Sequence, residues 1–267
     1  MVVAAHPDDE TLGFGGVLVH YARAGVETSL LTATRGDRGR YHGHPFGSEE
    51  HPGPQALGEI RERELRAAAD VLGLREVAFL DYEDQLLDRA DPVDAVAAIV
   101  GHIRRVRPQV VLTFDPSGAY GHPDHIAISQ FATGAVVAAA DPAFAHGSGL
   151  GAPHTVSKLY YLAWDEETWA AYQTGFKKLV VTVDGVERQA TAWPTWALTT
   201  IVETGEARAD VWRAVACHAS QTRAYDALNT LAPVQRDALW RTQSFYRAYS
   251  LVNGGRTRES DLFEGLR

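Results

Sequence analysis

Short apolar runs alternate with segments of helical periodicity over the first 165 residues. The apolar runs cover residues 2–5, 26–32, 77–80, 109–114 and 159–163. Runs of this length that are apolar on both faces are typical of strands buried in a parallel sheet. The pattern therefore predicts five buried strands.

Between these runs, apolar residues recur at helical spacing in residues 12–24, 57–72, 92–107 and 126–140. The second of these helices is followed by Gly73, a residue type that commonly closes helices in a left-handed conformation. Strands separated by helices indicate an α/β fold, a Rossmann-like, mostly parallel sheet flanked by helices.

The alternation weakens after residue 163. Residues 179–183 followed by Asp184-Gly185 suggest a hairpin, residues 207–219 a helix and residues 245–251 a last strand. An α/β chain of 267 residues is often one domain. We predict one domain over 1–267, with a Rossmann-like core (1–165) and a smaller mixed C-terminal portion (166–267) that completes the fold.

Charge and composition argue against some classes of binding partner. Lys and Arg number 25 against 34 Asp and Glu, a net charge of −9 that argues against nucleic acid and against stable association with an anionic membrane. No run of about 18 apolar residues is present. With the single Cys217, we expect a soluble, cytoplasmic protein in a reducing compartment. A homo-oligomer is compatible with the sequence, which leaves the oligomeric state open.

Chemistry-bearing residues follow two of the predicted strands. The chain reads A-H-P-D-D-E (5–10) after the first strand and Y-G-H-P-D-H (120–125) after the fourth. Open parallel sheets bind ligands at the carboxyl ends of their strands. A lone His-Pro is more often a capping or surface residue, but two His-Pro-Asp clusters at two strand ends favour a functional site.

Each cluster holds a pair of side chains three residues apart, His6 with Asp9 and His122 with His125, which can project to one side of a helical turn. Catalytic zinc takes three nitrogen or oxygen ligands and leaves a fourth position for water. Two ligands from one cluster and one from the other would supply that set. These imidazole and carboxylate groups are the ones that a metal-dependent hydrolase needs.

A dinucleotide fingerprint is the competing interpretation of Gly13, Gly15 and Gly16. Leu18 stands where a third glycine is required, and the adjacent aspartates would repel a pyrophosphate. Close packing of the helix against the sheet explains these glycines better. A nucleotide-binding module without chemistry therefore ranks last among the functions considered.

The two motifs, A-H-P-D-D-E and H-P-D-H, together resemble the LmbE-like (PIG-L) family of zinc-dependent N-acetylglucosaminyl deacetylases. The resemblance covers about the first 165 residues and, more faintly, the rest. It implies that His6, Asp9 and His125 are zinc ligands and that Asp8 is the general base. An imidazole and carboxylate site could also accept iron or cobalt.

The resemblance also gives roles to the second motif. His122 would protonate the leaving amine or stabilise the oxyanion, Asp124 would hold the His122 imidazole, and Tyr120 would be a further oxyanion donor. A histidine held by a carboxylate is kept in one tautomer, and a carboxylate beside acidified water can accept its proton.

Three further residues resemble substrate-binding positions of the family: Arg61, Asp84 and Arg38. The alternatives are a solvated helix face for Arg61, a turn-forming role for Asp84 and an exposed loop arginine for Arg38. His218 in H-A-S-Q resembles a C-terminal family signature or packs structurally. Val211 stands where the family often has lysine, which weakens that part of the match.

The function implied is hydrolysis of the N-acetyl group of a small N-acetylglucosamine-type substrate or conjugate. An amidase that cleaves a larger N-acyl group or a thiol conjugate would carry the same motifs, because only the pocket differs. The group attached to the sugar stays open. We expect the long loops 35–54 and 141–154 to shape its pocket.

Overall fold

The computed structural model describes residues 1–146, 149–176, 180–183, 185–189, 191–221, 230–255 and 257–267. Leu179 and Asp184 of the predicted hairpin lie outside the described residues. Within the described chain, seven strands form one sheet in the order β3-β2-β1-β4-β5-β9-β8, and β6 pairs with β7. The strands are β1 (Val2–Ala4), β2 (Ser29–Thr34), β3 (Glu76–Tyr82), β4 (Val110–Phe114), β5 (Lys158–Leu162), β6 (Val180–Val183), β7 (Val186–Gln189), β8 (Thr200–Glu203) and β9 (Thr242–Ser250).

The first five strands are parallel, and β9 and β8 extend the sheet in antiparallel pairing. The predicted α/β architecture with a mostly parallel sheet is confirmed. Residues of β1, β2 and β4 are buried on both faces, which explains their continuous apolar character.

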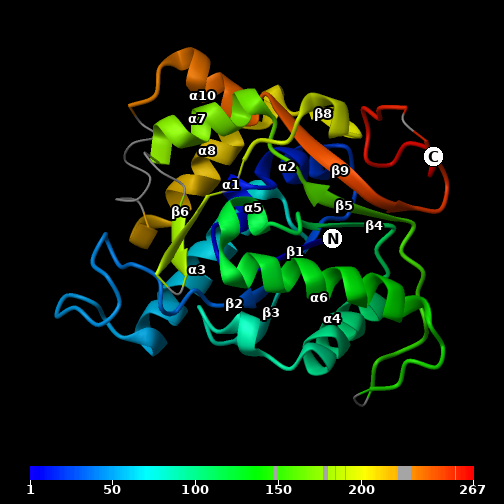
Figure 1. Ribbon diagram of the computed structural model, residues 1–267, viewed down its shortest axis with the longest axis horizontal. Coiled ribbons are helices and arrows are strands. Elements are labelled where there is room, and N and C mark those ends of the chain that lie inside the picture. The colour runs from blue at the N-terminus through cyan, green and yellow to red at the C-terminus, as the bar shows by residue number, and fades with distance from the viewer. Residues whose placement is uncertain (147–148, 177–179, 184, 190, 222–229, 256) are drawn as a thin grey trace.

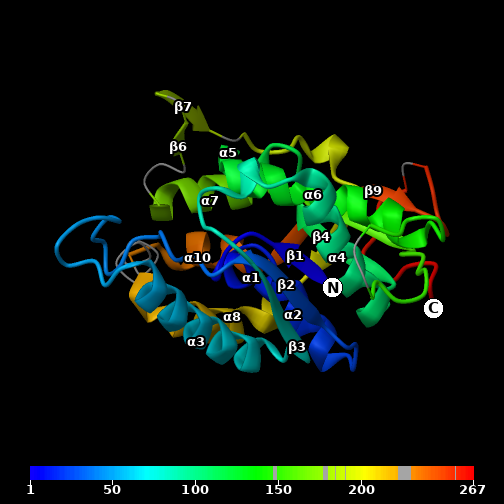
Figure 2. The same cartoon turned by 90° about the horizontal axis from the view of Figure 1, so that it is seen from below.

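Helices cover both faces of the sheet, with α4 and α6 on one side and α2, α3 and α8 on the other (Figures 1 and 2). None of the described helices is long and apolar enough to cross a membrane. The helices are α1 (Asp9–Leu12), α2 (Gly15–Arg23), α3 (Pro54–Leu72), α4 (Pro92–Val106), α5 (Gly118–Gly121), α6 (Pro123–Ala140), α7 (Glu166–Phe176), α8 (Arg208–Cys217) and α10 (Pro233–Trp240), with short 3-10 helices at η1 (Leu87–Arg89), η2 (Thr195–Ala197), η3 (Gly205–Ala207) and η4 (Ala219–Gln221).

Local signals set several helix ends. The carboxylate of Asp91 accepts the backbone N–H groups of Val93 and Asp94 and so caps the start of α4. Gly73 closes α3 with a φ of 75°, in the left-handed region that glycine adopts without strain.

Several predicted boundaries are wrong; the last strand, for example, begins at Thr242 rather than at residue 245. The second strand begins at Ser29 rather than at Val26, because the Val26 N–H donates to the Tyr21 carbonyl and completes the turn that ends α2. The helix predicted over 12–24 is broken into α1 and α2 at Gly13 and Phe14. The sequence pattern also missed α7, β8 and α10.

The glycines after β1 allow the start of α2 to pack closely against its neighbours, as interpreted from the sequence. A Cβ on Gly16 would lie 2.8 Å from Thr204 Oγ1 and 2.9 Å from Gln243 Oε1. Gln243 in turn accepts the Val17 N–H and donates to the Gly13 carbonyl. This start of α2 is therefore locked against β9 and the residues after β8.

The 141–154 loop joins α6 to β5. Its described part follows the C-terminal end of α6, and His154 Nε2 lies 2.8 Å from the Pro108 carbonyl, just before β4. An α-helix of this length spans roughly 27 Å at about 1.5 Å per residue. The loop therefore begins and ends at the opposite end of α6 from His122, but His146 Nε2 lies 2.7 Å from Asp94 in the first turn of α4, so a role of the loop in shaping the pocket stays a prediction.

A buried polar cluster ties the C-terminal tail to the sheet. The ammonium of Lys158 lies 2.7 Å from Glu259, and both side chains are at most 1% exposed. The Glu259 carboxylate also accepts hydroxyl hydrogen bonds from Tyr160 and Thr200. Burial alone would raise the pKa of Glu259, but these donors lower it to about 2.

We predict that Glu259→Gln lowers the free energy of unfolding at pH 7 by about 3–5 kcal/mol, because it leaves Lys158 buried without its counter-charge. A depressed carboxyl pKa adds stability above its ordinary value of 4.5, which is lost as pH falls toward about 2. The difference between wild type and variant in urea unfolding should therefore shrink below pH 4.5. A difference under about 1 kcal/mol at pH 7 would contradict this account.

Candidate metal centre

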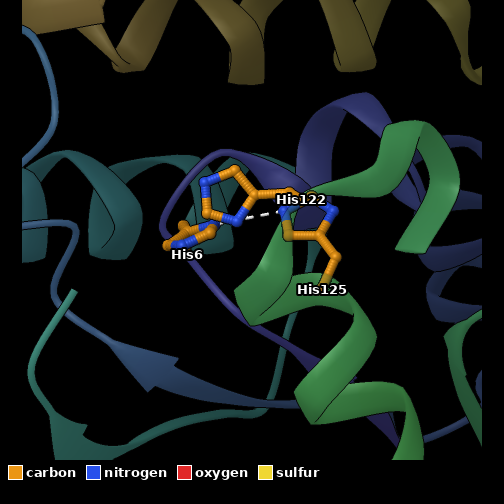
Figure 3. A group of neighbouring side chains, drawn as sticks. All are labelled: His6, His122 and His125. Carbon is orange, nitrogen blue, oxygen red and sulfur yellow. Dashed lines mark hydrogen bonds between the residues drawn. The ribbon is translucent and has the colours of Figure 1, made fainter. Parts of the chain in front are cut away.

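The sheet topology brings the two sequence motifs together. Strands β1 and β4 are neighbours, with Val2 paired to Leu112, so the segments that follow them emerge side by side. His6 and Asp9 come directly after β1, and His125 lies in the first turn of α6. Figure 3 shows three imidazoles converging there, those of His6, His122 and His125.

His6, His125 and Asp9 place nitrogen and oxygen atoms at distances close to those between the ligands of one metal ion. His6 Nδ1 is 3.1 Å from His125 Nε2, and Asp9 oxygens lie 3.3 Å from His125 Nε2 and 3.7 Å from His6 Nδ1. Tetrahedral zinc with bonds of about 2.0–2.1 Å separates its ligands by roughly 3.3 Å. The three predicted ligands are therefore neighbours, with a different Asp9 oxygen facing each imidazole, and their binding of a metal stays a prediction. His122 lies close enough to His6 and His125 to form an alternative group.

Buried partners orient these ligands. The other ring nitrogen of His6, Nε2, lies 3.1 Å from Asp124 Oδ2 and 3.2 Å from Asp84 Oδ1. Asp9 Oδ2 accepts the backbone N–H groups of Ala5 and His6, at 3.1 and 2.8 Å. Metal-binding histidines commonly donate their second N–H to a carboxylate, which fixes the ring and its tautomer.

The ring of His125 is fixed by stacking. It lies parallel to Phe114, the last residue of β4, with centroids 4.0 Å apart and an interplanar angle of 11°. His125 is 2% exposed, so its orientation is set by the core rather than by solvent. Its Nε2 is thereby directed toward His6 and Asp9.

Charge at the site favours a cation. Burial disfavours the imidazolium of His6, but Asp124 and Asp84 outweigh it and raise the His6 pKa well above the ordinary 6.5. Burial would raise the Asp9 pKa, but His125 and His6 depress it. The carboxylates that stabilise positive charge on His6 would equally stabilise a divalent ion, so the donor set fits a metal.

The position of Asp124 differs from the prediction that it holds the His122 imidazole. Its carboxylate accepts the backbone N–H groups of Gln85 and Leu87, at 2.7 and 3.1 Å, which turn it toward His6. His122 instead accepts the Asp124 backbone N–H at Nδ1, over 3.2 Å, as the N-cap of α6. Asp124 thus supports a metal ligand.

Asp8 is held from two sides. Its φ of 107° is rare for a residue other than glycine and costs on the order of 1–3 kcal/mol. Arg61 Nη2 lies 3.0 Å from Asp8 Oδ2, and the same guanidinium donates to the carbonyls of Pro7 and Gly36. Arg61 is 4% exposed and holds Asp8 in place, and its contact with a sugar stays a prediction.

Asp84 and Arg38 meet at the edge of the centre. The buried Asp84 carboxylate accepts the Arg38 backbone N–H at 3.0 Å and contacts His6 with its other oxygen. The Arg38 guanidinium pairs with Glu83 and lies 5.4 Å from the Phe46 ring centroid. Contact of either residue with substrate stays a prediction.

Tyr120 lies beside the imidazoles, with its ring centroid 5.1 Å from that of His125. Burial, followed by the nearby carboxylates, raises the Tyr120 pKa, so the hydroxyl keeps its proton and can donate. Its loop bends through Gly118 and Ala119, both at positive φ, and the Asp115 carboxylate accepts the Ala119 N–H at 2.7 Å.

Sequence reasoning missed three supporting residues: Glu10, Phe114 and Asp115. Glu10 belongs to the first motif and is fully buried. An acidic residue next to a buried strand was the signal in the sequence that could have pointed to it. In the sequence, Phe114 looks like an ordinary core residue, and Asp115 looks like a residue that ends a strand. Their contacts depend on spatial neighbours that no local pattern reveals.

Comparisons with known proteins agree with this geometry. The profile of the GlcNAc-PI de-N-acetylase (PIG-L) family matches residues 1–136. The 1D-myo-inositol 2-acetamido-2-deoxy-alpha-D-glucopyranoside deacetylase of Kineococcus radiotolerans is 32% identical over all of this chain and 82% of its own length. Its namesake from Streptomyces avermitilis is 31% identical, covering all of this chain and 96% of the relative.

The fold is also found in solved structures. N,N'-diacetylchitobiose deacetylase from Pyrococcus horikoshii superposes with a TM-score of 0.67 at 20% identity, covering 92% of this chain and 82% of that one. The family and the full-length relatives identify the chain as a deacetylase, a hydrolase of amide bonds. The chain belongs to the PIG-L, or LmbE-like, family.

We predict that His125→Ala abolishes stoichiometric metal binding, because removal of a ligand weakens a site more than the roughly 10–100-fold lost with an outer partner. Elemental analysis of the purified protein measures this. His122→Ala is the matched control and should retain the metal. The reverse pattern, with metal kept by the His125 variant and lost by the His122 variant, would refute the assigned ligand set.

Proposed function

We propose that the protein is a zinc-dependent N-deacetylase of N-acetylglucosamine-type small molecules. The observation that carries this proposal is the clustering of the His6, Asp9 and His125 side chains, with Asp8 next to Asp9 in the chain. His6 Nδ1 lies 3.1 Å from His125 Nε2, and the two Asp9 oxygens lie 3.3 Å from His125 Nε2 (Oδ1) and 3.7 Å from His6 Nδ1 (Oδ2). The names of the full-length relatives, deacetylases of an acetamido-glucopyranoside of inositol, support the sugar and the acyl group.

His6, Asp9 and His125 would hold the ion. Zinc bound there would polarise the amide carbonyl and bring the pKa of its water toward neutrality. Imidazole and carboxylate donors suit zinc and also accept iron or cobalt. The contacts of His6 Nε2 with Asp124 and Asp84 would keep Nδ1 directed toward the ion.

Asp8 would act as the general base. Arg61 holds the Asp8 carboxylate through Oδ2, and a carboxylate beside the metal-bound water can accept its proton. Hydrolysis adds water across the amide, giving acetate and an amine, so the proton taken by Asp8 is available to the leaving nitrogen. One carboxylate can therefore serve both proton transfers.

His122 and Tyr120 would stabilise the negative charge that develops on the carbonyl oxygen. Because His122 Nδ1 accepts the Asp124 N–H, a neutral imidazole carries its proton on Nε2 and can donate there. This tautomer supports the oxyanion role of His122 over protonation of the amine. Tyr120 would add a second donor.

The sugar and its attached group would lie beside the 35–54 loop. The contact of Arg38 with Asp84 holds the start of that loop against the metal centre. The loop projects from the body between β2 and α3 (Figure 1). It is therefore placed to shape the pocket for the group attached to the sugar.

We predict that Asp8→Asn lowers kcat for acetate release by at least about 10²-fold, because an amide cannot accept the proton of water. The metal content should match wild type, since Asp8 is not a ligand. The measurement is acetate release from N-acetylglucosamine conjugates, including the inositol glycoside, by zinc-loaded protein. Undiminished turnover by the variant would refute the role of Asp8, and a wild type inactive on every conjugate would refute the proposed substrate class.

A further inference from the structure

A buried pair, Glu10 and His218, lies behind the proposed catalytic base. His218 Nε2 is 2.7 Å from Glu10 Oε1, and both side chains are 0% exposed. The two residues are 208 positions apart, one in the first motif and the other in the C-terminal portion. Because a carboxylate only accepts hydrogen bonds, the ring nitrogen of His218 is the donor.

The second oxygen of Glu10 reaches the backbone of the base. Glu10 Oε2 accepts the Asp8 N–H at 2.9 Å. Asp8 is the residue with a φ of 107°, a region that side-chain-bearing residues seldom occupy. A hydrogen bond to the amide of this residue therefore favours the unusual backbone conformation that sets where the Asp8 carboxylate points.

His218 is itself held in place by its own segment. The Ser220 N–H and hydroxyl donate to the two oxygens of Glu64 on α3, at 2.6 and 2.7 Å. The amide of Gln221 donates to the Arg40 carbonyl in the 35–54 loop, at 2.8 Å. The segment 218–221 thus joins three pieces of the site: the first motif, α3 and the loop.

We propose that His218 is a positioning residue for the reaction, acting through Glu10 to fix the backbone of Asp8. The proposal rests on the proposed role of Asp8 as base. His218 aligns the Glu10 carboxylate, and Glu10 aligns Asp8 by its N–H while Arg61 aligns the same residue by its side chain. No proton passes along this chain of contacts, because a backbone amide is its last link.

The test uses His218→Ala, Glu10→Ala, their double variant and His218→Gln in the zinc-loaded full chain. His218→Ala should lower kcat by about 10²-fold, as expected for a displaced catalytic group, with KM changed less than about twofold. Metal content should stay at the wild-type level. His218→Gln, whose amide can donate to Glu10, should recover most of the lost kcat.

A second readout is independent of substrate. Exchange of the Asp8 backbone amide with solvent, followed by NMR, should be faster in His218→Ala and Glu10→Ala than in wild type, and slowed again in His218→Gln. Tyr160→Phe, which loses a buried hydrogen bond at Glu259, is the control for general loosening and should change neither kcat nor this exchange.

Because His218 acts through Glu10, the double variant should be no slower than Glu10→Ala alone. Multiplying effects of the two single variants, or unchanged Asp8 exchange in His218→Ala, would overturn the proposal. So would a folded His218→Ala with wild-type kcat. If wild type releases no acetate from any conjugate, the proposed function fails, and the exchange data still decide whether His218 controls Asp8.

Discussion

Four carboxylates and three imidazoles lie around one point at the carboxyl ends of β1 and β4, and the surrounding structure serves to keep their charges compatible. Burial raises the cost of every charge there, so each carboxylate needs a donor. Arg61 supplies one for Asp8, and the amides of Gln85 and Leu87 supply two for Asp124. A divalent ion would compensate the negative charge of the carboxylates that these donors leave unbalanced.

The parallel sheet makes this concentration of charge possible. Both motifs follow strands that are neighbours in the sheet, so each contributes ligands without a long connection crossing the site. The residues behind the ligands come from other segments, with Asp84 following β3 and Phe114 ending β4. The 218–221 segment adds the C-terminal portion to the same assembly. The site therefore depends on the whole fold.

Periodicity predicted the elements of the parallel core because each buried strand and amphipathic helix carries its own local signal. The antiparallel extension was harder to predict, because β8 has four residues and pairs with residues of β9 that lie 39 to 45 positions further along the chain. Motif spacing predicted two ligands from one cluster and one from the other, and the family resemblance selected His6, Asp9 and His125. The structure places these side chains next to one another.

Roles that depend on side-chain direction could not be read from spacing. The resemblance gave Arg61 a contact with a sugar, and the structure adds that its guanidinium is buried against Asp8 and two carbonyls. Asp124 follows His122 closely in the chain, yet the amides at 85 and 87 turn its carboxylate toward His6. Both side-chain directions depend on hydrogen-bond partners from segments distant in sequence, acceptors for Arg61 and donors for Asp124.

The dependence of catalysis on one metal ion per chain is the central claim, and a metal titration tests it most directly. Protein stripped with a chelator and verified metal-free should release no acetate from an N-acetylglucosamine conjugate. Activity should then rise linearly with added zinc and level off at about one equivalent per chain, as expected for three protein ligands around a single ion. Full activity in verified metal-free protein would contradict the account.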